Sequence, residues 1–139
     1  MLVLQPEALA AREARRWVRG ALASQGLLEL LDVAELLITE VVTNSVLHAG
    51  TRIEVSIGPP TADGVRLEVR DGSGVGPVRR IGLSRTATTG RGTHLLDSLA
   101  SRWGWEPTTD GGKVTWFLVL PDLGDDASSP EDLMDRWAT

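Results

Sequence analysis

The sequence predicts an α/β two-layer sandwich in which a mixed, largely antiparallel sheet is covered on one face by helices. Two long segments in the first third of the chain, 6–23 and 28–48, have the apolar periodicity of helices. The later segments are short, rich in β-branched or aromatic residues, and separated by turns that contain glycine. Helices grouped apart from antiparallel strands are typical of this fold class, and 139 residues suit one such domain.

Each expected helix has a recognisable boundary in the sequence. Pro6 suits the first turn of a helix over residues 6–23, because proline at that position loses no hydrogen bond. Gly26 separates this helix from the second one, which is expected to start at about Leu28 or Asp32 and to end at His48. A third, shorter helix is expected to follow Gly92.

The expected strands form one short N-terminal strand and two hairpins. Asp63 and Gly64 suit the turn of the first hairpin, and Gly111 and Gly112 lie in the turn of the second. The strands are expected at residues 2–4, 52–57, 65–70, 102–106 and 113–120.

Glu40, Asn44 and His48 interrupt the otherwise apolar second helix at four-residue spacing. Four residues turn a helix by about 400°, so the three side chains line one stripe along its surface. Burial of such groups is costly unless they meet partners or a ligand. Oxygen donors such as Glu and Asn suit a hard cation such as Mg²⁺. The alternative is that the stripe faces water, as one face of most helices does.

Two glycine-rich segments follow this helix in the chain. Asp71 ends an alternating strand and opens the first segment, 71–77, where its carboxylate could accept a hydrogen bond from the amino group of a base. We expect no structural task for this carboxylate. The second segment, Gly90-Arg91-Gly92, opens a helix whose free N–H groups suit a phosphate. Each segment alone is more often structural, but their order after the Glu/Asn helix favours a nucleotide site.

In this order the segments resemble those of the GHKL superfamily of ATP-binding domains, which includes gyrase, Hsp90, histidine kinases and MutL. The chain looks most like the small anti-sigma-factor serine kinases and their actinobacterial single-domain relatives. The resemblance implies the histidine-kinase-like ATPase fold, with ATP and Mg²⁺ as cofactors. It also implies that Glu40 is the general base, that Asn44 coordinates Mg²⁺ and that Asp71 contacts the adenine amino group.

The resemblance extends to further residues of a nucleotide site. The usual first glycine box is Asp-x-Gly-x-Gly, but here the glycines stand one position out of phase. A threonine on the closing strand often supports the adenine-binding aspartate in this family, and Thr115 has that place here. The further residues implied to bind the nucleotide are His48, Gly74, Gly76, Gly90, Arg91, Gly92, Thr93 and Thr115.

The function implied by the resemblance is that of an ATP-dependent serine/threonine protein kinase that doubles as an anti-sigma factor. Its partners would be a sigma factor, which it sequesters, and a STAS-type anti-anti-sigma protein, which it phosphorylates; the resemblance also allows a homodimer. The alternative is a non-catalytic nucleotide-binding module whose output is partner exchange. The catalytic domain of a histidine kinase is a third interpretation, which the lack of a dimerisation helix or phosphoacceptor domain disfavours.

Composition divides the chain and disfavours other classes of protein. The net charge of −5 comes entirely from an acidic tail at 121–139, which leaves the expected GHKL-type ATP-binding domain at 1–120 neutral. Nucleic-acid binding, which needs a basic surface, is therefore not expected. The absence of cysteine excludes disulfides and thiolate metal sites. In the tail, Ser129 and Pro130 suit the start of a short helix.

The sequence predicts neither a membrane span nor a secretory signal. No segment is apolar over the roughly 20 residues that are needed to span a bilayer. The N-terminal residues lack the basic region and long apolar core of a secretory signal. We therefore expect a cytoplasmic protein that does not bind membranes.

Overall fold

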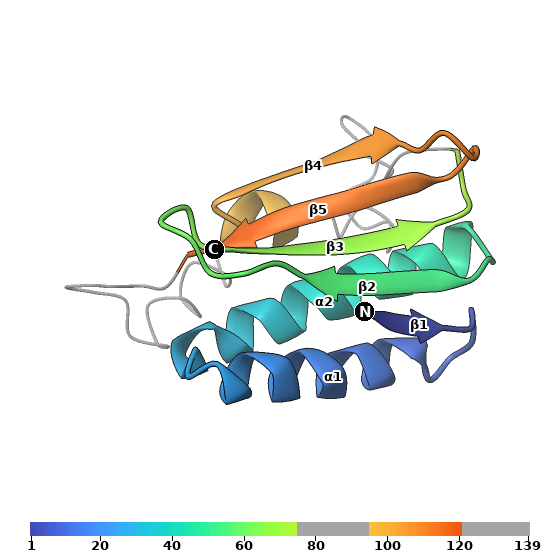
Figure 1. Cartoon of the computed structure of the whole chain (residues 1–139). Helices are drawn as coiled ribbons and strands as arrows, with labels where there is room; N and C mark the ends of the chain where they lie inside the picture. The colour runs from blue at the N-terminus through green and yellow to red at the C-terminus, as the bar shows by residue number, and fades with distance from the viewer. Residues whose placement is uncertain (75–94, 121–139) are drawn as a thin grey trace.

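Two helices pack against one face of a five-stranded antiparallel sheet in the computed structural model, which describes residues 1–74 and 95–120 (Figure 1). The strands lie in the order β1-β2-β3-β5-β4, and each neighbouring pair is antiparallel. The elements are β1 (Leu2–Leu4), α1 (Ala10–Ser24), a 3₁₀ turn (Leu28–Leu30), α2 (Leu31–His48), β2 (Ile53–Ile57), β3 (Val65–Asp71), β4 (Arg102–Pro107) and β5 (Lys113–Val119).

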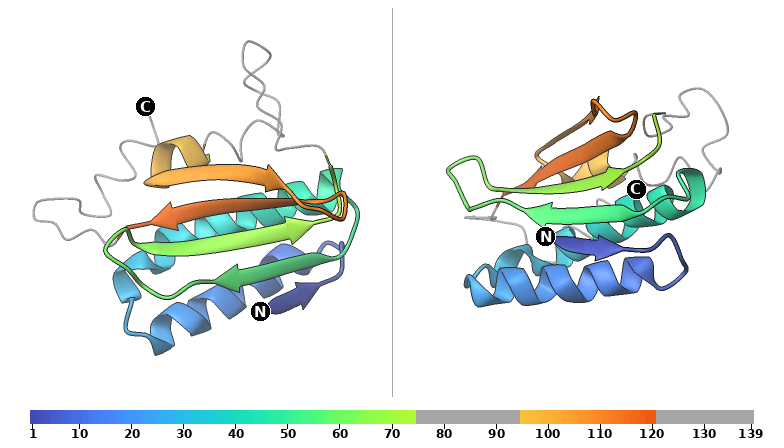
Figure 2. Two further views of the ribbon diagram at one scale, coloured as in Figure 1. Left: turned by 45° about the horizontal axis from the view of Figure 1, so that its top comes forward. Right: turned by 45° about the vertical axis from the view of Figure 1, so that its right-hand side comes forward.

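The predicted α/β layering is confirmed. Both views in Figure 2 show α1 and α2 on the same side of the sheet. The described strands contain no parallel pair, so the part of the prediction that allowed a mixed sheet is wrong for this portion of the chain. Residues 95–99 are helical, as expected for the end of the third helix. The acidic tail lies outside the described residues.

Helix α1 begins later than the sequence suggests. Its first residue is Ala10, whereas the prediction placed the start at Pro6. The amide of Glu7 donates to the carbonyl of Gln5 at 2.8 Å, and the amide of Ala10 donates to the carbonyl of Glu7 at 2.9 Å. Proline suits a turn as well as a helix start. Turn hydrogen bonds therefore replace the expected first helical turn.

The core lies between the helices and the sheet. Val65, Leu67 and Val69 of β3 are buried and alternate with more exposed polar residues, so they face the helices. Phe117 on the neighbouring strand β5 is fully buried on the same side. Helix α2 contributes more buried residues than α1. No helix in the described part of the chain is both long enough and apolar enough to cross a membrane.

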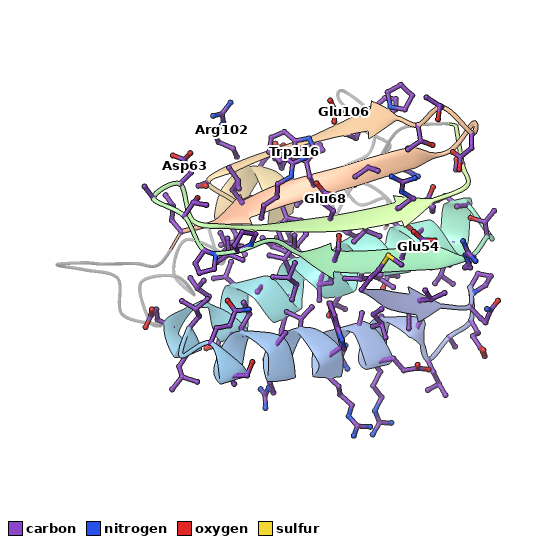
Figure 3. The ribbon with its side chains drawn as sticks, in the orientation of Figure 1. Glu54, Asp63, Glu68, Arg102, Glu106 and Trp116 are labelled. Atoms are coloured by element: carbon purple, nitrogen blue, oxygen red, sulfur yellow. The ribbon has the colours of Figure 1, made fainter. Side chains whose placement is uncertain are left out.

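The opposite face of the sheet carries charged side chains, and Figure 3 shows Glu68, Glu106 and Trp116 projecting from it. Arg66 forms an ion pair with Glu68 at 2.7 Å and lies 4.5 Å from the centroid of the Trp116 ring. Gly104 leaves room for this indole, since a Cβ there would lie 2.8 Å from a ring carbon. Exposed ion pairs contribute little to stability. The helix-covered face therefore dominates the energetics of the fold.

Candidate functional site

A buried ion pair joins the end of β3 to the start of β5. Asp71 and Lys113 stand opposite each other in the antiparallel register. The ammonium of Lys113 donates to both carboxylate oxygens of Asp71, at 2.9 Å to Oδ1 and 2.8 Å to Oδ2. The Asp71 side chain is 1% exposed and that of Lys113 is 7% exposed. Because so little water reaches the pair, solvent screens this charge-assisted contact weakly.

Two further donors complete the surroundings of the Asp71 carboxylate. The Ser45 hydroxyl on α2 donates to Oδ2 at 2.6 Å, and the amide of Ser73 donates to Oδ1 at 2.9 Å. A carboxylate offers about four lone-pair directions, and these contacts together with those of Lys113 occupy them. The expectation that this carboxylate has no structural task is therefore wrong. It connects α2, β3 and β5.

Lys113, rather than Thr115, supports Asp71. Thr115 is buried on the same strand, opposite Val69, and its hydroxyl makes no hydrogen bond to any described residue. The support that the resemblance assigns to Thr115 comes instead from Lys113 and Ser45. Sequence reasoning missed both residues. Lys113 is the only lysine of the chain, and it lies two residues before Thr115 on the same strand, so the two side chains point to the same face. This spacing could have identified Lys113 from the sequence.

The polar stripe of α2 lies in the C-terminal half of the helix, which also carries Ser45. Glu40 and Asn44 are half-buried, whereas His48 at the end of the helix is exposed. The alternative, a stripe that faces water, therefore holds for His48, whereas Glu40 and Asn44 are only partly exposed to water. Asn44 immediately precedes Ser45, which is bonded to Asp71, and the Asn44 side chain makes no hydrogen bond within the described part of the chain.

Glycine backbone packs closely around the loop that follows Asp71. The amide of Gly72 donates to Oγ1 of Thr51 at 2.7 Å. In the β4–β5 turn, Gly112 approaches so closely that a Cβ there would lie 2.2 Å from the carbonyl oxygen of Asp71. Gly74 packs on the same turn, where its Cβ would lie 3.1 Å from a carbonyl oxygen. The other predicted site residues lie outside the described residues: Gly76, Gly90, Arg91, Gly92 and Thr93.

Substitution of Gly112 by alanine is expected to destabilise the protein by about 1–3 kcal/mol, since the added Cβ would force the turn away from Asp71. Gly20→Ala is the matched control, because its Cβ would meet no atom within 4 Å and alanine favours the interior of α1. Urea denaturation of both variants measures the effect. A Gly112→Ala variant as stable as the native protein would contradict the close approach.

Asp110 holds the β4–β5 turn that packs on Asp71. Its carboxylate accepts hydrogen bonds from the Thr108 hydroxyl and, at 3.3 Å, from the amide of Gly112. The pKa of Asp110 lies below its ordinary value, mainly because its carboxylate accepts the hydrogen bond from the Thr108 hydroxyl.

The lowered pKa of Asp110 predicts how the stability of this turn depends on pH. A group whose pKa is depressed by folding stabilises the folded state at neutral pH, and this stabilisation is lost as the pH falls through the folded-state pKa. Thr108→Ala removes the hydrogen bond that is the main cause of the lowered pKa of Asp110. Titration of the native protein and of the variant, followed by NMR at Asp110, should show a higher pKa in the variant. An unchanged pKa would contradict the role of the Thr108 hydroxyl.

Two surface hollows border these elements. The smaller one, at the end of β3, has a volume of about 160 Å³ and is lined by Thr51, Arg52, Glu54, Arg70, Asp71, Gly72 and Asp110. It falls below the roughly 300–1,000 Å³ of typical small-molecule pockets. The larger one, of about 310 Å³, lies between α1 and α2 and is lined by Arg15, Arg19, Asp32, Glu35, Leu36 and Thr39. None of the predicted site residues lines the larger hollow.

Comparison of the chain with protein-family models and with curated proteins found no match. The site has three distinguishing features: a carboxylate surrounded by donors, a half-buried carboxamide one residue from that cluster, and a buried lysine and threonine on the same face of β5.

Proposed function

We propose that this chain is an ATP-binding domain with the histidine-kinase-like ATPase fold, which acts as an anti-sigma factor with serine/threonine kinase activity. The supporting observation is the 2.6 Å hydrogen bond from Ser45 to Asp71, because it brings the turn of α2 that carries Asn44 next to the aspartate at the end of β3. Two segments 26 residues apart, each predicted to bind nucleotide, thus meet. A sheet with helices on one face is compatible with this fold.

Asn44 fits the role of a Mg²⁺ ligand. Its carboxamide is half-buried and makes no hydrogen bond to a described residue. Within residues 1–74 and 95–120, no group of three or more His, Cys, Asp or Glu could hold a metal ion. Mg²⁺ commonly takes one or two protein ligands and completes its shell with water and nucleotide phosphates, which suits a single carboxamide. Bound there, it would neutralise charge on the phosphates.

Glu40 would act on the hydroxyl that accepts the phosphoryl group. It lies one helical turn before Asn44, so the two side chains occupy neighbouring turns of the same face. An acceptor hydroxyl between them could give its proton to the Glu40 carboxylate as its oxygen bonds to the γ-phosphorus of ATP, while the bond from that phosphorus to the bridging oxygen breaks and ADP leaves. The acceptor would be a serine or threonine of a STAS-type partner, and a sigma factor would be the protein sequestered. These partners, and a homodimer, are proposed on the resemblance alone.

A nucleotide-binding module without phosphoryl transfer is the second candidate function. The loop that follows Asp71 favours it, because its glycines stand one position out of phase with the usual glycine box. Donors of the chain itself also occupy the lone-pair directions of the Asp71 carboxylate. An adenine amino group would have to displace one of these donors to reach Asp71. In this case the nucleotide acts as a conformational ligand that shifts the affinity for a partner protein.

Calorimetry with ATP, in the presence and absence of Mg²⁺, tests the proposed site. The native protein is expected to bind ATP more tightly with Mg²⁺, and Asn44→Ala is expected to lose this difference because it lacks the carboxamide oxygen. Thermal denaturation of the variant should stay close to that of the native protein.

Thr43→Ala is the control, since Thr43 is the neighbouring half-buried residue of α2. It should retain the effect of Mg²⁺. Failure of the native protein to bind ATP would contradict the proposal. An Asn44→Ala variant that melts at a much lower temperature but keeps its Mg²⁺ dependence would show that Asn44 is structural.

A further inference from the structure

Two buried polar side chains on β5 have unused hydrogen-bonding capacity. An ammonium has three N–H donors, and Lys113 directs contacts only to the two oxygens of Asp71 among the described residues. The hydroxyl of Thr115 also lacks a described partner. Taken as whole residues, Lys113 is 6% exposed and Thr115 is 3% exposed. Buried polar groups without a partner are uncommon in proteins, because each one loses its hydrogen bonds to water.

The two side chains lie on the same side of the sheet. Residues two apart on a strand point in the same direction and are separated by about 7 Å along it. The Lys113 ammonium is held in place by its two contacts with Asp71, at 2.8 and 2.9 Å. Asp71 itself is already surrounded by Ser45, Ser73 and Lys113. The cluster therefore has donors to offer to a ligand and no free carboxylate lone pair.

We infer that Lys113 reads the nucleotide base and that Asp71 is a positioning residue for Lys113. This inference rests on the proposed function and changes which side chain contacts the base. The third N–H of Lys113 donates to a ring-nitrogen acceptor, N1 in adenine, and the Thr115 hydroxyl donates to the same nitrogen. The exocyclic amino group of adenine makes no essential contact with Asp71. Because Lys113 and Asp71 neutralise each other, the site suits an uncharged base.

Two nucleotide analogues distinguish direct recognition by Lys113 from direct recognition by Asp71. The triphosphate of 1-deazaadenosine lacks the N1 acceptor and keeps the amino group. The triphosphate of purine riboside keeps N1 and lacks the amino group. Calorimetry on the native full-length chain compares both with ATP. The 1-deaza analogue should bind about tenfold to a hundredfold more weakly than ATP, the usual effect of losing a hydrogen bond to a charged group. The purine riboside analogue should bind as ATP does.

A cycle with Lys113→Met locates the effect on this side chain. In the variant, the affinities for ATP and for the 1-deaza analogue should differ far less than in the native protein, because the ammonium that donates to N1 is gone. Circular dichroism at the temperature of the assay shows whether the variant is folded. If it is unfolded, the comparison of the analogues on the native protein still tests the inference.

The outcomes separate the inference from the proposed function. Loss of binding for the purine riboside analogue with retention for the 1-deaza analogue would overturn the inference and assign base recognition to Asp71. Equal affinities for all three nucleotides would also overturn it. No binding of ATP by the native protein would instead reject the nucleotide site itself, and the inference with it.

Discussion

Replacement of Lys113 by methionine is expected to destabilise the fold by about 3–5 kcal/mol, because the Asp71 carboxylate would stay buried without its counter-charge. In a domain of this size, such a change lowers Tm by roughly 10–20 °C. The Asp71 side chain is 1% exposed, so water cannot readily replace the ammonium. The hydroxyl of Ser45 and the amide of Ser73 would still donate, but neither carries a charge. Thermal denaturation followed by circular dichroism measures the loss.

Arg66→Met is the matched control for this substitution. It also breaks an ion pair, but the side chains of Arg66 and Glu68 are 41% and 39% exposed, so we expect a cost of about 1 kcal/mol or less. The double variant Asp71→Asn/Lys113→Met should recover part of the stability, since it removes the uncompensated charge. A Lys113→Met variant that melts no lower than Arg66→Met would exclude the buried ion pair.

Substitution of Glu40 by glutamine is expected to reduce phosphoryl transfer by about 10²–10⁴-fold, the usual contribution of a general base. The affinity for ATP should stay nearly constant, because Glu40 is proposed to contact the acceptor hydroxyl and not the nucleotide. Transfer of radiolabelled phosphate from ATP to a candidate STAS-type protein, or to water, measures the rate. Calorimetry measures the affinity on the same preparations.

Glu35→Gln provides the control for Glu40. Glu35 is another half-buried glutamate of α2, and it forms an ion pair with Arg19 at 2.9 Å, away from Asp71. Its substitution should leave both transfer and ATP affinity unchanged. Native protein that binds ATP tightly but labels no protein would argue against the kinase and favour the nucleotide-binding module. A Glu40→Gln variant that transfers phosphate at the native rate would remove Glu40 from the chemistry.

Most of the secondary structure could be predicted from the sequence because helix and strand periodicity are local. The alternation of Val65, Leu67 and Val69 identified β3, and Asp63 with Gly64 identified its hairpin turn, where Gly64 has a φ of 105°. The start of α1 was predicted wrongly at Pro6, since proline fits a turn and a helix start equally well. The five-residue helical end at 95–99 agrees with the expected third helix.

The sequence by itself determined the layers of the fold, the stripe on α2 and the position of Asp71 at a strand end, because each depends on residues close together in the chain. Only the tertiary structure decided what Asp71 contacts. Lys113 follows it by 42 residues and reaches it through the antiparallel register of β3 and β5, while Ser45 reaches it through the packing of α2 on the sheet. A buried carboxylate takes whichever donors these separate elements bring to it, and no local spacing encodes that meeting.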